Sequence, residues 1–149
     1  MSLLLALLAG CASTGAQRIS EPASSIQQLR IDAQGQWQVE LRLQNYSNVA
    51  MRFDQVDLAL SIDGKPAGQL QAAPALTVAA ESAEILALSL TPSLPAKLQA
   101  ADALATGRGF AYQLKGTVKA STGNGKPRNY SLQRDSALSP APGLPGVLR

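Results

Sequence analysis

Apolar and polar residues alternate along several stretches of this 149-residue chain. Successive side chains of a strand point to opposite faces, so a period of two is typical of strands with one buried and one wet face. The pattern predicts seven strands, at about 26–31, 37–44, 56–62, 68–72, 86–90, 110–118 and 126–133. Asp63-Gly64, directly after the third strand, is a strong signal for a β-hairpin turn.

One stretch has a helical period instead. Its recurring apolar residues are Leu94, Leu98, Ala101 and Leu104. Ser93 can cap a helix over Pro95–Ala105, and Gly107 ends it. We therefore expect an all-β fold, an immunoglobulin-like antiparallel β-sandwich of about seven strands with one short helix. Because no second cysteine is present for a cross-sheet disulfide, an antibody-type domain is not expected.

Composition removes most kinds of catalytic chemistry. The chain has one cysteine and no histidine, so it lacks the commonest general base and the commonest metal ligand. Asp54 and Asp57 are three residues apart, which on a regular strand places them on opposite faces and argues against a paired acid site. We therefore expect no catalytic residues, no metal, no cofactor and no enzymatic activity.

The single cysteine, Cys11, follows a short apolar run at the start of the chain. This is the form of a secretory signal and its processing site. Leu8-Ala9-Gly10-Cys11 resembles the lipobox of bacterial lipoproteins, which implies cleavage after residue 10 and lipid, including palmitate, on Cys11. Ala12 after the cysteine implies an outer-membrane lipoprotein that faces the periplasm.

Two alternatives to this signal remain at the sequence level. The positively charged segment that normally precedes the apolar run is missing, so either the natural start lies upstream or the signal is weak. The run could instead be a buried N-terminal strand with an ordinary free cysteine. A membrane-spanning helix needs about 20 apolar residues, and the polar residues from Ser13 onward end the run too early for one.

The pattern divides the chain into four segments. Residues 1–10 are the expected signal peptide, and 11–24, small and polar, are a tether that holds the domain off the membrane. Residues 25–135 carry the periodic hydrophobic signal of one domain. Residues 136–149 contain three prolines and two glycines and predict an irregular tail.

Charge is uneven along the chain. From Lys97 onward there are eight basic and two acidic residues, against five and eight before it. In a membrane-tethered protein, Lys115, Lys119 and Lys126 could contact anionic head groups. The other interpretation is a solvated face that keeps the domain soluble. Nucleic acid is not an expected partner, because aromatic residues make up only 4% of the chain and leave few stacking platforms.

The order of features is similar to that of a known family. An alternating strand ends in Asn45-Tyr46-Ser47-Asn48 and is followed by Met51-Arg52-Phe53-Asp54, a strand into residues 62–68, and the loop 74–82. This order resembles the late embryogenesis abundant group two family, including its water stress and hypersensitive response domain. The family usually has Asn-Pro-Asn at the first corner, where asparagine side chains can cap backbone groups. We expect Asn45 and Asn48 to be such corner residues.

The resemblance implies a small exported lipoprotein, linked to tolerance of desiccation and water stress. Two alternative functions belong to other classes. A sandwich that opens between its sheets could carry a lipid or another apolar ligand. An envelope assembly or adaptor module could instead bind a protein partner through an exposed edge strand. In each case we expect a monomer attached to the membrane by its N-terminal lipid.

Overall fold

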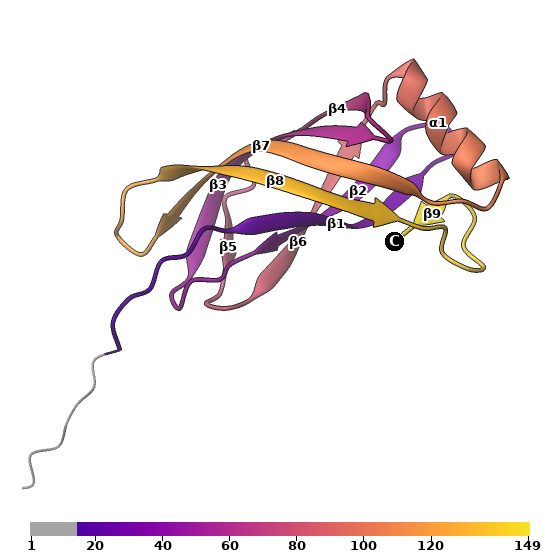
Figure 1. Cartoon of the computed structure of the whole chain (residues 1–149). Helices are drawn as coiled ribbons and strands as arrows, with labels where there is room; N and C mark the ends of the chain where they lie inside the picture. Colours follow the sequence, from indigo (N-terminus) through magenta and orange to yellow (C-terminus); the bar gives the residue numbers. More distant parts are fainter. Residues whose placement is uncertain (1–14) are drawn as a thin grey trace, which may run out of the picture.

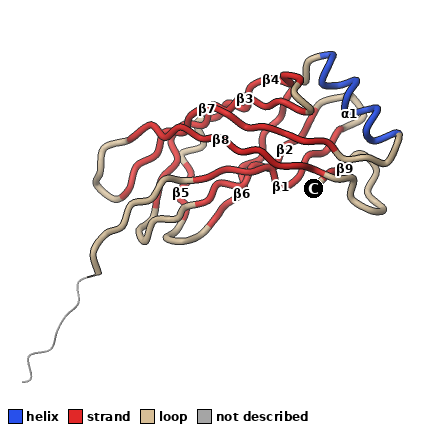
Figure 2. Tube along the Cα trace, in the orientation of Figure 1, coloured by secondary structure: helices blue, strands red, loops and turns tan. Residues whose placement is uncertain are grey.

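The computed structural model describes residues 15–149, which form two packed antiparallel sheets and one helix (Figures 1 and 2). In these residues the elements are β1 (Ala23–Ile31), β2 (Trp37–Gln44), β3 (Met51–Ile62), β4 (Lys65–Ala72), β5 (Leu76–Val78), β6 (Ala83–Leu90), α1 (Leu94–Ala105), β7 (Phe110–Thr122), β8 (Arg128–Leu138) and β9 (Val147–Leu148). One sheet has the order β6-β2-β1-β9, and the other has the order β4-β3-β7-β8 with β5 also paired to β3. The predicted all-β sandwich with one short helix is confirmed.

The alternation along the chain sorts side chains into the core as predicted. In β2, Trp37, Val39, Leu41 and Leu43 are buried, while the residues between them lie at or near the surface. The largest buried side chains, among them Phe53, come from both sheets and fill the space between them. The seven predicted strands are all present, and the two that the alternation did not predict, β5 and β9, are the shortest.

A β-bulge in β3 corrects the expectation for the two nearby aspartates. The pairing with β7 runs from Phe53 to Gln55 and leaves Asp54 as an extra residue. An extra residue shifts the alternation by one position. Asp54 forms an ion pair of 3.0 Å with exposed Arg52, and Asp57 is exposed between two buried residues, so both carboxylates belong to the outer face.

The helix has the predicted position but presents a different face to the core. Ser93 caps it, since its hydroxyl accepts a hydrogen bond from the Ala96 amide at 3.3 Å. The residues that α1 buries are Ala96, Ala100 and Ala103, whereas Leu94 and Leu98 are 66% and 61% exposed. The leucine spacing therefore predicted that a helix exists but not which side packs.

The last fourteen residues are not the irregular tail that we expected. β8 continues to Leu138, and β9 pairs with β1 through Leu148 and Val147. Both β9 side chains are buried. The prolines and glycines of this segment shape the loop between β8 and β9, and Leu148 returns the chain to the core. In Figure 1 the C-terminus lies near α1, and the N-terminal segment leaves the opposite end of the sandwich.

Candidate functional site

The expected lipid attachment site lies outside the described residues. Cys11 and the expected cleavage motif Leu8, Ala9 and Gly10 belong to residues 1–14. Within residues 15–149, no helix is long and apolar enough to cross a membrane. A lipid on Cys11 would therefore be connected to the domain through the residues that follow position 14.

Asn45 organises the corner after β2 from a fully buried position. Its side-chain amide donates to the carbonyl oxygens of Val49 at 2.8 Å and Ala79 at 3.0 Å, and to that of Val78 at 3.2 Å. Its side-chain oxygen accepts from the Ser47 amide at 2.9 Å. The hydrogen bonds confirm Asn45 as a corner residue, and they join the β2–β3 loop to the end of β5.

The same corner holds the N-terminal segment Ala16–Ser20, which we name the strap. Asn48 accepts a hydrogen bond from the Arg18 amide at 2.8 Å and donates to the Ala16 carbonyl at 2.9 Å. The Asn48 amide also donates to the Arg18 carbonyl at 3.2 Å. The buried Ser47 hydroxyl accepts from the Ser20 amide at 2.9 Å. Asn48 is thus a corner residue whose side chain binds the strap.

An ion pair closes this strap over the neighbouring loop. Arg18 lies 3.0 Å from the carboxylate of Glu81, and both side chains are largely exposed. The Glu81 amide donates to the Ser47 carbonyl at 3.0 Å, so the loop before β6 is part of the same arrangement. Sequence reasoning missed Arg18, Ser20 and Glu81, because their pairing spans 27 to 63 residues and leaves no local periodic signal.

A small polar groove lies beside the strap. It is lined by Ile19, Ser20 and Glu21 from the N-terminal segment and by residues 128–131 at the start of β8, and its volume is about 320 Å³. The Arg128 guanidinium lies 5.6 Å from the centre of the Tyr130 ring, which is a cation–π distance. The groove therefore places a basic residue of the β7–β8 hairpin next to the strap.

The three lysines that we expected at head groups do not form one cluster. Lys115 and Lys119 lie four residues apart along β7, the first exposed and the second half-buried, on the outer face of its sheet. Lys126 lies in the turn between β7 and β8, at the end of the sandwich that the N-terminal segment leaves (Figure 1). Lys119 pairs with Asn129, the neighbour of Arg128, so it lies near the same end on the outer face of the sheet, and only Lys115 lies farther along β7.

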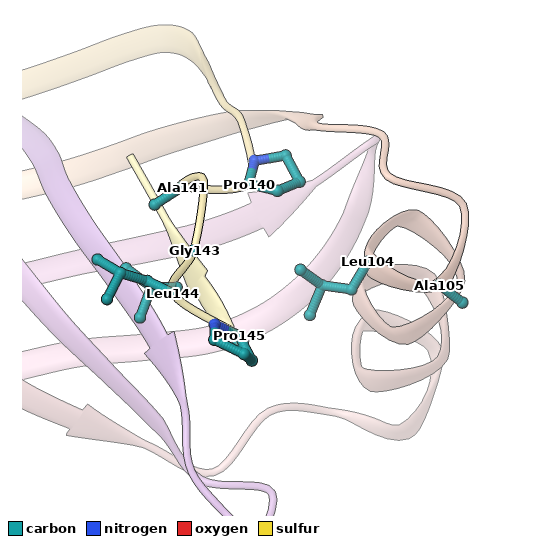
Figure 3. Close-up of a pocket in the computed structure, with 9 residues that line it drawn as sticks. Leu104, Ala105, Pro140, Ala141, Gly143, Leu144 and Pro145 are labelled. Atoms are coloured by element: carbon teal, nitrogen blue, oxygen red, sulfur yellow. The ribbon is translucent and has the colours of Figure 1, made fainter.

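An apolar groove of about 520 Å³ lies at the opposite end of the molecule, between the end of α1 and the β8–β9 loop. Figure 3 shows Leu104 on the helix side and Pro140, Leu144 and Pro145 on the loop side. No charged residue lines it. Its shape and lining suit an apolar ligand better than a polar one.

The turn between β1 and β2 holds the pKa of the Asp32 carboxyl below its usual value. Burial alone would raise this pKa. Hydrogen bonds from the Gln36 amide, the Gln38 side chain and the Gln34 amide, together with the positive charge of Arg30, lower it by more, so the pKa of Asp32 lies below its usual value. The two amides lie 2.9 Å from the carboxylate. These contacts are those of an Asx turn, whose role is structural.

Residues 15–149 hold no group of three or more acidic, histidine or cysteine side chains that could bind a metal ion. The bulge brings Asp54 and Asp57 to one face, but Asp54 is paired with Arg52 and Asp57 accepts a hydrogen bond from Gln71 at 3.2 Å. The two carboxylates therefore have partners on the protein itself.

The fold and its buried asparagine corner define a small two-sheet sandwich in which a polar loop end holds the N-terminal segment. A family model described as late embryogenesis abundant protein (LEA_2) matches residues 40–133. The chain therefore belongs to the late embryogenesis abundant protein family, as the order of its sequence features indicated. No curated protein matches it in sequence.

Two solved structures share the fold at low sequence identity. A protein from Arabidopsis thaliana, solved in solution, is 8% identical with a TM-score of 0.52, over 83% of this chain and 80% of that chain. The X-ray structure of a structural genomics target is 13% identical with a TM-score of 0.51, over 83% and 89%. A crystal structure from Archaeoglobus fulgidus is also 13% identical, with a TM-score of 0.47 over 83% and 98%.

Proposed function

We propose that this protein is a lipid-anchored, non-enzymatic domain of the bacterial envelope, held on the outer membrane and facing the periplasm, with a role in tolerance of water stress. The observation that carries the anchor is Cys11 directly after Leu8-Ala9-Gly10, only a few residues before the folded domain. Membership of the late embryogenesis abundant family supports the stress role.

The physical chemistry of the anchor suits a permanent attachment. Burying acyl chains contributes about 0.8 kcal/mol per methylene, so a cysteine that carries several chains stays in the membrane. The domain itself is folded, with a core drawn from both sheets. It therefore differs from disordered protective proteins, which lack enough apolar surface to form a core. We expect it to act during water loss as a folded domain held at the membrane surface.

Replacing Cys11 with Ser tests the anchor. We expect the Cys11→Ser variant to lose incorporation of labelled palmitate and to leave the membrane fraction, because the chain has no other thiol. Ala12→Ser, one residue away, is the matched control and should keep both. A strain carrying only Cys11→Ser should survive drying as poorly as a deletion strain. Membrane retention and labelling of the serine variant would exclude the lipobox interpretation.

The apolar groove beside α1 favours one second candidate, a carrier of an apolar ligand. The space between the sheets is filled by core side chains, so the groove of Figure 3 would replace the interior site that the sequence suggested. Its volume of about 520 Å³ lies in the usual range for small-molecule sites.

Lipid extraction from the Cys11→Ser protein separates the two functions. A carrier should retain about one apolar molecule per chain, and Leu144→Asp in the groove should abolish this retention. Leu98→Asp is the matched control, because Leu98 is an exposed leucine of α1 that does not line this groove. If mass spectrometry finds no bound lipid in the extracts, the carrier function is excluded and the anchored stress protein remains.

A further inference from the structure

The strap limits how far the folded domain can move from a lipid on Cys11. In its first hydrogen bond to the domain, the Ala16 carbonyl accepts from the Asn48 side-chain amide. Ala16 comes five positions after Cys11, and five chain steps span at most about 18 Å. β7 alone has 13 residues, which correspond to about 43 Å of strand. The end of the sandwich that holds the strap must therefore stay close to the membrane, while the end that carries α1 need not.

The loops around the strap form one end of the sandwich. The β2–β3 corner binds the strap, the loop before β6 joins it through Glu81, and the groove with residues 128–131 places the start of β8 beside it. In Figure 1 the turn between β7 and β8 projects at this end, and α1 and β9 lie at the other. We name this part of the surface, made of residues 45–50, 79–82 and 122–128, the strap end.

Charge distinguishes the strap end from the flat outer face of the sheet. On the outer face of β3, β7 and β8, the basic residues Arg52, Lys115 and Lys119 are balanced by Asp54, Asp57 and Asp135. The β7–β8 turn, residues 123–127, and the first residue of β8 together contain Lys126 and Arg128 and no acid. Glu81 at the strap end is neutralised by Arg18 of the strap, and Glu21 lines the groove beside Arg128, so Lys126 is the cation of the turn that lies away from these acids. Anionic head groups would therefore be attracted to the turn more than to the flat face.

We propose, on the basis of the proposed lipid anchor, that the strap makes the domain stand end-on, with Lys126 and Arg128 of the strap end against anionic lipid head groups. The strap supplies the orientation because it fixes the exit of the chain, and the two basic residues supply the attraction. The apolar groove and the exposed leucines of α1 then point away from the membrane.

Fluorescent probes at the two ends test this orientation in the lipidated full chain. The only native thiol would be blocked by the lipid, so Asn124→Cys in the turn and Ala101→Cys on α1 each provide a single labelling site. Both positions are exposed. In vesicles of phosphatidylglycerol and phosphatidylcholine that contain a head-group nitroxide lipid, we expect strong quenching at residue 124 and near-background quenching at 101. Equal quenching at both positions, or stronger quenching at 101, would overturn the proposal.

Two matched pairs of variants separate the strap from the charges. Asn48→Ala removes both side-chain hydrogen bonds to the strap and should abolish most of the difference between the probes, whereas Gln71→Ala, an exposed polar residue away from the strap, should not. Replacing Lys126 and Arg128 with Gln should reduce quenching at residue 124, and the same change at Lys65, which contacts α1, and at Lys97 on α1 should have no effect. If the difference in quenching between the two probes is unchanged in Asn48→Ala, the strap is not the cause of the orientation.

Measuring the mass of the purified protein distinguishes a failure of the proposed orientation from a failure of the proposed lipid anchor. A sample without the lipid mass on Cys11 contradicts the anchor itself. A lipidated sample with equal quenching at the two ends contradicts only the orientation. Added salt provides one more distinction, because attraction between exposed charges decays over about 10 Å at 0.1 M ionic strength. Salt should weaken the contribution of Lys126 and Arg128 and leave that of Asn48 in place.

Discussion

At the scale of single residues, the polar side chains that connect the most segments are the buried ones. Asn45 and Ser47 are fully buried, and their hydrogen bonds hold two loops and the strap. The sequence identified Asn45 and Asn48 as corner residues, because asparagine is a common turn residue. It gave no information about their distant partners, since a hydrogen bond between Asn48 and Arg18 leaves no local pattern.

Asp32 gives a prediction about pH. Its pKa is lowered in the folded chain, so its carboxylate stabilises the fold above the unfolded-state pKa of about 4, and this contribution is lost as the pH falls through the folded-state pKa. Asp32→Asn keeps an oxygen acceptor for the turn amides but removes the charge. We expect the variant to be less stable than the wild type at neutral pH.

The difference between the two chains should shrink as the pH is lowered below about 4, where the wild-type carboxyl also becomes neutral. Urea unfolding at a series of pH values measures it. Asp57→Asn, the same change on the outer face of β3, is the control for the loss of one negative charge. A constant difference between wild type and Asp32→Asn across this range would show that the charge contributes nothing.

At the scale of elements, the sequence predicted which segments are strands and helix more reliably than how they face. Helical spacing of leucines predicted α1, yet the helix packs through alanines. It lies close to β4, where the Ser93 hydroxyl donates to the Pro66 carbonyl at 2.6 Å and the Ser93 amide donates to the Ala67 carbonyl at 2.9 Å. Close approach to a strand leaves room only for small side chains, and this space is a tertiary property.

The bulge in β3 is a second case in which tertiary pairing overrides a local rule. Alternation in the sequence has one phase up to Phe53 and another from Val56 onward, and only the pairing with β7 shows that both belong to one strand. Sequence reasoning therefore began this strand at Val56 and placed Asp54 and Asp57 on opposite faces. Short strands were missed for a related reason, since three residues in β5 and two in β9 are too few to show a period.

At the scale of the whole molecule, the two ends of the sandwich have different chemistry. The strap end is polar and carries charges of both signs, and the other end carries the apolar groove and the exposed leucines of α1. The sequence indicated an uneven charge but could not place it, because Lys115 and Lys126 are close in sequence yet lie on different parts of the surface.

The closing strand β9 provides the last prediction, which concerns the stability of the whole domain. Leu148 is fully buried and Val147 nearly so, and the Gly146 carbonyl accepts from the Ile31 amide at 2.9 Å. Burying two such side chains contributes about 1.5 to 3 kcal/mol each. Because domains of this kind are stable by only about 5 to 15 kcal/mol, a chain that ends at Ser139 should be close to unfolding.

A point variant tests the same contribution if the shortened chain does not fold. Leu148→Ala should lower the free energy of unfolding by about 2 to 5 kcal/mol, since it leaves a cavity in the core. Leu144→Ala, in the same segment but 45% exposed, is the matched control and should change it by less than about 0.5 kcal/mol. Urea unfolding followed by fluorescence measures both, because Trp37 is the only tryptophan of the chain and is fully buried. Equal unfolding midpoints for Leu148→Ala and the wild type would mean that β9 contributes nothing to the core, and residues 136–149 would then be the passive tail that their composition suggests.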